Sequence, residues 1–90
     1  VISMDLFPKY QEKEIKATKT ASEEMWQLNK DLWDVHEVLE KGYDCSTSKR
    51  KPNILERCIR KGKFIFKAVV VDCGDYYQLI HFGKFGYKRR

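Results

Sequence analysis

The sequence predicts an α+β fold in which two N-terminal helices pack on a three- to four-stranded antiparallel meander. Three observations lead to this prediction. Apolar residues recur at helical spacing between residues 21 and 41, and after residue 42 the apolar period changes to two, which is typical of strands. Turn signals at residues 61–63 and 73–75 then divide the second half of the chain into consecutive strands. Helices followed by strands in this order favour an α+β architecture.

Ninety residues predict one domain, residues 1–90, in which we expect residues 1–12 and 86–90 to be flexible ends. A core in so short a chain must be dense, and 42% hydrophobic residues supply it. The longest apolar stretch, residues 64–71, is too short to span a membrane, and no signal peptide opens the chain. We therefore expect a cytoplasmic protein that makes no membrane contact.

The cysteines favour reduced thiols over a disulfide framework, because their number is odd and no export signal precedes them. Their spacings of 13 and 15 residues also match no zinc motif. The sequence therefore predicts neither a metal site nor another cofactor, and we expect free thiols at Cys45, Cys58 and Cys73.

The first two elements are a short strand and a helix. The alternation of apolar and polar residues over residues 13–19 favours an edge strand. A helix is expected from Ala21 to about Lys30, with Thr20 or Ser22 as its N-cap.

A second helix is the clearest local prediction, over residues 32–41. Asp31 is available as its N-cap, and Gly42 stands where a glycine commonly ends a helix. The two tryptophans, Trp26 and Trp33, are expected in the core more often than on the surface. One apolar stripe of this helix is formed by Leu32, Val35, Val38 and Leu39.

Three strands are expected in the second half, over residues 54–60, 64–72 and 76–85. The middle strand is the strongest because it is rich in β-branched and aromatic residues. Residues 43–48 are a candidate for a further strand before a basic loop. The three main strands, joined by short turns, predict the meander.

The last hairpin leaves two registers open. A three-residue loop at residues 73–75 pairs Lys67 with His81 and places Tyr77 on the same face. A two-residue turn shifts each pair by one position and puts Ala68 opposite His81. Only the first register gathers a lysine, an imidazole and a tyrosine on one face of the sheet.

The net charge of +5 is unevenly distributed, because the positive excess lies in the second half of the chain. Such clusters attract nucleic acid or acidic partners, although a lysine-rich loop is also an ordinary solvated surface. The candidate nucleic-acid contacts are Lys49, Arg50, Lys51, Lys84, Lys88 and Arg89.

Residues 18–25 and 32–42, together with the strand-like runs at 67–72 and 79–85, carry a resemblance to a known family. The chain resembles small uncharacterised prokaryotic proteins with a RelE-like toxin fold, over about residues 15–86. RelE-type toxins are small ribonucleases with two helices on a four-stranded antiparallel sheet. The resemblance implies a domain that cleaves or binds RNA, and a toxin of this type implies an acidic antitoxin-like protein partner.

Metal-free RNA cleavage needs a proton acceptor, a proton donor and cations that stabilise the phosphorane. Histidine suits either proton role, whereas arginine and lysine suit the phosphate. The resemblance implies these roles for residues of matching type, which are His81, Lys67, Arg57 and Tyr77. The same residue types also occur as structural histidines, outward-facing lysines and ordinary strand tyrosines.

The sequence therefore leaves two functional hypotheses from different classes. The first is a toxin-type ribonuclease that acts on RNA. The second is a non-catalytic module that binds nucleic acid or a protein through the basic meander. A stable domain without any nucleic-acid role is a third interpretation, and the sequence specifies neither the substrate nor the oligomeric state.

Overall fold

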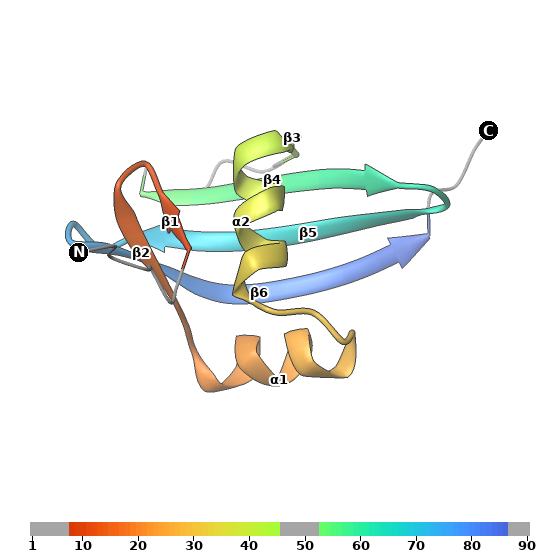
Figure 1. The fold of residues 1–90 in the computed structure, drawn as a ribbon, viewed down its shortest axis with the longest axis horizontal. Coiled ribbons are helices and arrows are strands. Elements are labelled where there is room, and N and C mark those ends of the chain that lie inside the picture. Colours follow the sequence, from red (N-terminus) through yellow and green to blue (C-terminus); the bar gives the residue numbers. More distant parts are fainter. Residues whose placement is uncertain (1–7, 46–52, 87–90) are drawn as a thin grey trace, which may run out of the picture.

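The computed structural model describes residues 8–45 and 53–86 (Figure 1). These residues form an α+β fold in which two helices pack on a six-stranded mixed sheet that curls into a half-barrel. None of the described helices is long and apolar enough to cross a membrane. The elements, in chain order, are β1 (Lys9–Tyr10), β2 (Lys13–Ala17), α1 (Lys19–Gln27), α2 (Leu32–Lys41), β3 (Tyr43–Asp44), β4 (Ile54–Lys61), β5 (Phe64–Asp72) and β6 (Tyr76–Gly86).

The sheet is larger than the predicted meander, with strand order β1-β2-β6-β5-β4-β3. Strands β4, β5 and β6 form the expected antiparallel meander. Strand β2, predicted at an edge, instead lies between β1 and β6 and pairs parallel to β6, with Ile15 opposite Tyr77. Alternation predicts a strand but not its neighbours, and parallel pairing is possible because a long connection, containing both helices and strands β3 to β5, separates β2 from β6. At the other edge β3 adds two residues to the sheet.

Helix α1 begins earlier than predicted. The Thr18 hydroxyl accepts a hydrogen bond from the Ala21 N–H at 3.1 Å, so Thr18 is the N-cap in place of Thr20 or Ser22. The helix gives way to a turn before Asn29, which adopts a left-handed φ of 61°.

Helix α2 has the predicted bounds and cap. Asp31 accepts the N–H of Asp34 at 3.1 Å, and the Asp34 carboxylate accepts the N–H of Asp31 at 2.9 Å, which completes a capping box. Gly42 ends the helix for a steric reason, since a Cβ there would collide with the carbonyl oxygens of Val38 and Cys58. The end of α2 can therefore approach the backbone of β4 closely.

The hydrophobic core lies between the helices and one face of the sheet, which we call the covered face. The expectation for the tryptophans is wrong, because Trp26 is 81% and Trp33 52% exposed. Trp26 directly follows Met25, which points into the core, so its own side chain faces away from the sheet. The core includes Ile15, Met25, Val35, Val38, Leu39, Phe66, Ala68, Val70, Leu79 and Phe82.

The β5–β6 hairpin differs from both registers that the sequence left open. Near its turn Val70 lies opposite Leu79, which corresponds to the two-residue-turn register. A β-bulge then shifts the pairing by one residue, so Val69 rather than Ala68 lies opposite His81. Local sequence does not reveal the extra residue, Ile80, that this bulge inserts.

The bulge decides which side chains share a face. Phe66 and Phe82 lie on the covered face, and Tyr77 joins them in the interior. Beyond the bulge, His81 lies on the opposite face, which we call the outer face, with Lys67. The predicted grouping of Tyr77 with those two residues is therefore wrong.

The cysteines also depart from expectation, because Cys45 and Cys58 form a disulfide. Antiparallel pairing of β3 with β4 brings their Cα atoms to 5.8 Å, within the usual range for a disulfide. Sequence spacing alone does not show this pairing. Only Cys73, which is exposed, is a free thiol among the described residues.

Candidate functional site

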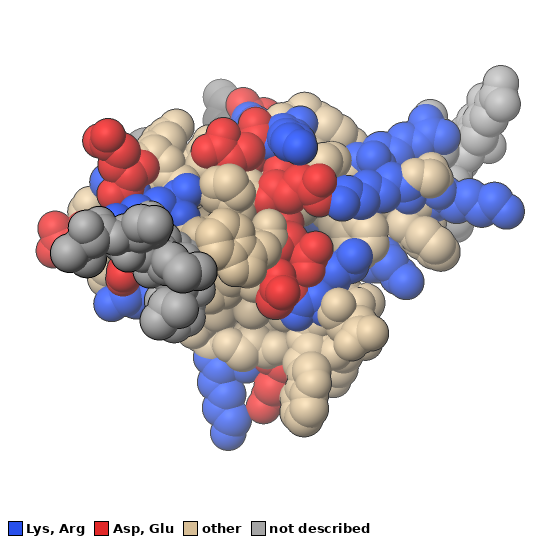
Figure 2. Space-filling model, viewed as in Figure 1, with Lys and Arg blue, Asp and Glu red and all other residues tan. Residues whose placement is uncertain are grey.

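Positive charge gathers at the end of the sheet formed by the β4–β5 turn and the last residues of β6. Figure 2 shows Lys and Arg over this end and a band of Asp and Glu beside it. Residues 57–71 and 76–90 contain no Asp or Glu, so all the charged residues of these two segments are basic. We call this surface the basic tip, formed by Arg60, Lys61, Lys63, Phe64, Lys84 and Phe85.

The tip protrudes because the neighbouring strands stop short of it. Strand β3 pairs with β4 only as far as Cys58, and β2 pairs with β6 only as far as Leu79. The β4–β5 turn at Gly62 adopts a left-handed φ of 62°, which glycine tolerates without strain. Both Phe64 and Phe85 consequently remain exposed at the end of the hairpins.

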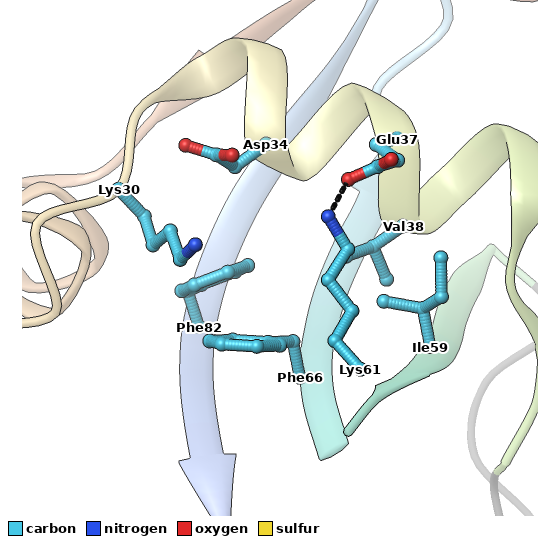
Figure 3. Close-up of a pocket in the computed structure, with 8 residues that line it drawn as sticks. All are labelled: Lys30, Asp34, Glu37, Val38, Ile59, Lys61, Phe66 and Phe82. Atoms are coloured by element: carbon cyan, nitrogen blue, oxygen red, sulfur yellow. Dashed lines mark hydrogen bonds and ion pairs between the residues drawn. The ribbon is translucent and has the colours of Figure 1, made fainter. Parts of the chain in front are cut away.

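The lysines of the tip are in two different situations. Lys84 lies over the Phe64 ring, with Nζ 4.4 Å from the ring centroid, and keeps its charge accessible. Lys61 instead forms an ion pair with Glu37 of α2 (Figure 3). The hydrogen bond from Lys61 holds the pKa of Glu37 below its ordinary value. Glu37 therefore neutralises one cation where α2 meets the tip.

The depression in Figure 3 is too small to hold a ligand. Its open volume is about 10 Å³, roughly the space of one water molecule. Lys30 fills part of it, with Nζ 4.8 Å from the centroid of the Phe66 ring. Its lining is Lys30, Asp34, Glu37, Val38, Ile59, Lys61, Phe66 and Phe82.

A larger depression of about 250 Å³, which we call the outer groove, brings together two of the predicted catalytic residues. His81 contributes a side chain that is 61% exposed. Lys67 reaches the groove from the neighbouring strand, while its Nζ forms a 2.7 Å ion pair with Glu56. The groove is lined by Glu24, Lys67, Val69, His81, Phe82, Gly83, Lys84 and Phe85.

Glu24 belongs to this groove although sequence analysis did not single it out. Its Oε1 accepts the Phe82 N–H at 3.1 Å and lies 3.7 Å from His81 Nδ1. The contact with Phe82 spans 58 residues of sequence, so no local pattern announces it. Helix α1 thus satisfies an N–H on the edge of β6 that β2 does not reach.

The other two predicted catalytic residues lie away from the outer groove. Arg57 donates to the Asp44 carboxylate at 3.0 Å and to the Gly42 carbonyl at 2.5 Å, which ties β4 to the end of α2. Tyr77 is buried and donates its hydroxyl to Gln11 Oε1 at 2.9 Å. Burial, reinforced by the charge of a nearby carboxylate, raises the pKa of Tyr77. The structure therefore does not bring the four residues together.

Of the predicted nucleic-acid contacts, Lys84 lies at the basic tip. The other five fall outside the described residues: Lys49, Arg50, Lys51, Lys88 and Arg89. The described residues contain no group of three or more His, Cys, Asp or Glu side chains placed to hold a metal ion.

A second depression, of about 330 Å³, lies where α1 meets α2. Its walls include the two exposed tryptophans. The exposure of Trp26 is already indicated by the helical spacing of Ala21, Met25 and Leu28, because Trp26 falls off that stripe. The lining is Pro8, Ser22, Met25, Trp26, Lys30, Asp31, Leu32 and Trp33.

Comparison with protein-family models, curated proteins and solved structures finds no significant match to this chain. The basic tip and the outer groove are therefore the features of this chain that indicate a function.

Proposed function

We propose that this protein binds single-stranded RNA through the basic tip and the adjoining outer groove. The observation that carries the proposal is the cluster of cations around exposed Phe64 and Phe85, on strands without a carboxylate at that end. Lysine and arginine attract phosphates, and exposed aromatic rings stack on unpaired bases. In a duplex the bases are already stacked on one another, so the exposed rings of the tip favour a single strand, whose bases are free to stack on them.

The resemblance to RelE-like toxins is in keeping with this proposal. Two helices on a sheet containing an antiparallel three-stranded meander are part of the expected plan, although β2 pairs in parallel and β1 and β3 extend the sheet. The resemblance implies an acidic antitoxin-like protein as the partner. Such a protein would compete with RNA for the same cations.

A second candidate function is RNA cleavage, which the shared position of Lys67 and His81 in the outer groove favours. Histidine can transfer protons, and Lys67 is the cation beside it for the phosphate. Arg57 and Tyr77 do not enter this version of the site, because each is held elsewhere. Cleavage is thus a narrower hypothesis than binding.

The test measures binding of a labelled single-stranded RNA and of a duplex across a salt series, with a chelator present. We expect Lys63→Ala combined with Lys84→Ala to weaken single-strand binding about tenfold and to reduce the salt slope by about 1.4. The matched control changes two exposed lysines at the other end of the sheet, Lys9→Ala with Lys16→Ala, and should bind as the wild type does.

Three outcomes separate the functions. Salt-dependent binding that the tip variant loses and the control retains supports RNA binding, and cleavage products in the same samples support the second candidate. Equal loss in both double variants means that net charge alone drives binding, which contradicts a defined site. Absence of binding at physiological salt refutes the proposal.

A further inference from the structure

His81 faces the outer groove only because of the bulge. Along β6, Tyr77 and Leu79 point into the core, so regular alternation would direct His81 inward as well. The extra residue, Ile80, reverses the alternation and turns His81 outward. Bulges commonly re-aim a side chain next to a functional site, which makes this irregularity evidence about His81 rather than an accident of packing.

Helix α1 holds β6 on both sides of that bulge. Before it, the Leu79 carbonyl accepts the N–H of Thr18, the N-cap of α1, at 3.0 Å. After it, the Phe82 N–H donates to Glu24 Oε1 at 3.1 Å. The same Oε1 lies 3.7 Å from His81 Nδ1, within ion-pair distance and slightly beyond a hydrogen bond. The Glu24 carboxylate is therefore fixed beside one particular nitrogen of the imidazole.

We propose that Glu24 is a positioning residue that holds Nδ1–H of His81 and so leaves Nε2 as the proton acceptor in the outer groove. The hydrogen bond made by one ring nitrogen decides which nitrogen carries the proton in the neutral ring. Catalytic hydrogen bonds are often long in free proteins and shorten when substrate binds. The 3.7 Å between His81 Nδ1 and Glu24 Oε1 has to shorten in this way for a hydrogen bond to form. The role of this pair in chemistry rests on RNA cleavage, the second candidate function.

The step that this arrangement serves is cleavage next to a ribose. Nε2 of His81 takes the proton of the 2′-hydroxyl while its oxygen forms a bond to phosphorus. The bond from phosphorus to the 5′-oxygen breaks, and that oxygen takes a proton from water, which gives a 2′,3′-cyclic phosphate and a 5′-hydroxyl. Lys67 lines the same groove and supplies positive charge toward the phosphate, although it also pairs with Glu56.

The first test does not depend on any activity. Nitrogen-15 NMR of the imidazoles, at a pH where both histidines are neutral, reports which ring nitrogen carries the proton. We expect the Nδ1–H form for His81 in the wild type and a shift toward the Nε2–H form in Glu24→Ala. Glu23→Ala, the adjacent exposed position on α1, is the matched control and should leave the spectrum unchanged. A His81→Gln variant assigns the signals against His36.

The same tautomer in the wild type and in Glu24→Ala, with the helix intact by circular dichroism, would overturn the proposal. Glu24→Gln keeps an oxygen that can accept an N–H, so a tautomer that changes in Glu24→Ala and is restored in Glu24→Gln depends on the acceptor oxygen at this position. The tautomer is measured on the protein without RNA. The test of the positioning role is therefore independent of the test of the proposed function.

The second test applies when RNA is cleaved. We expect Glu24→Ala to lower kcat about tenfold with little change in KM, and to have no further effect in a His81→Ala background, since a positioning residue acts through its partner. An equal loss from Glu24→Ala in both backgrounds would show that Glu24 does not act through His81.

Discussion

The two faces of the sheet are stabilised by different kinds of interaction. The covered face is apolar over most of its area, and Phe66 stacks on Phe82 with ring centroids 6.2 Å apart. The outer face carries cross-links in place of that packing. Both cross-links involve β4: the disulfide joins its Cys58 to Cys45, and an ion pair joins its Glu56 to Lys67 of β5. Glu56 is only 4% exposed although it bears a carboxylate.

This difference has a functional consequence. A packed apolar face leaves no accessible polar group for chemistry, whereas a face held by a few cross-links leaves the space between them open. The outer groove occupies such a space, with His81 exposed beside Lys67. The outer face should therefore respond to reductant and to charge substitutions, and the covered face to substitutions that remove volume.

The largest expected effect is loss of the disulfide between Cys45 and Cys58. It closes a loop with a sequence separation of 13 residues, for which the chain-entropy relation gives about 3 kcal/mol of stabilisation. Thermal unfolding of the Cys45→Ser variant should show a markedly lower Tm than the wild type. Addition of dithiothreitol should lower the wild-type Tm to a similar value.

Cys73→Ser is the matched control for this experiment, because Cys73 is exposed and unpaired in the described structure. Its Tm should equal that of the wild type under both conditions. An unchanged wild-type Tm in dithiothreitol would show that the cross-link does not stabilise the outer face.

A slightly smaller effect is expected for Lys67→Met. Removing the cation leaves the buried Glu56 carboxylate without its 2.7 Å partner, and breaking such a pair typically costs 3–5 kcal/mol. Because the Lys67 side chain is partly exposed, we expect about 2–3 kcal/mol in urea unfolding. Adding Glu56→Gln to Lys67→Met should recover part of the loss. A double variant less stable than either single variant would contradict this account.

Arg57 lies opposite Ala68 and is therefore a charged residue on the covered face. Arg57→Ala removes the hydrogen bonds to the Gly42 carbonyl and to Asp44, so we expect a loss of about 1–2 kcal/mol. Arg60→Ala, three residues along the same strand and exposed, is the matched control and should change stability less. If Arg57→Ala reduces RNA cleavage without lowering the free energy of unfolding, the residue has a catalytic role that its contacts do not suggest.

The sequence predicted features that depend on local patterns. The bounds of α2, its Asp31 cap and the three strands of the meander follow from spacing, capping and turn residues close together in the chain.

Features that depend on distant pairing escaped prediction. The position of β2 beside β6 and the approach of Cys45 to Cys58 both require knowledge of which strands are neighbours. The bulge at Ile80 changed the face of Tyr77 relative to His81, and so divided the predicted catalytic group. Half of that group, Lys67 and His81, still shares a groove.

The smallest expected effect concerns the rim of the covered face, where Lys13 pairs with Asp72 at 2.9 Å. The hydrogen bond from the Gly74 N–H, followed by that from Lys13, holds the pKa of Asp72 below its ordinary value of 3.8. The hydrogen bond to Asp72 also raises the pKa of Lys13 above 10.5.

These two directions define a pH window for the pair. A lowered carboxyl pKa contributes stability that is present above pH 3.8 and is lost as the pH falls through the folded-state pKa of Asp72. A raised ammonium pKa contributes stability that is present below pH 10.5 and is lost as the pH rises through the folded-state pKa of Lys13. The Tm difference between the wild type and Asp72→Asn should thus be constant near neutral pH and shrink in acid.

Lys13→Met separates the two causes of the Asp72 shift. It should lower the Tm less than Asp72→Asn does, because the Gly74 N–H still donates to the carboxylate at 2.9 Å. Glu14→Gln, on the neighbouring exposed position of β2, controls for net charge and should show no such pH dependence. A Tm difference for Asp72→Asn that stays constant down to pH 2 would mean that this pair does not stabilise the rim, and that the covered face depends on apolar packing alone.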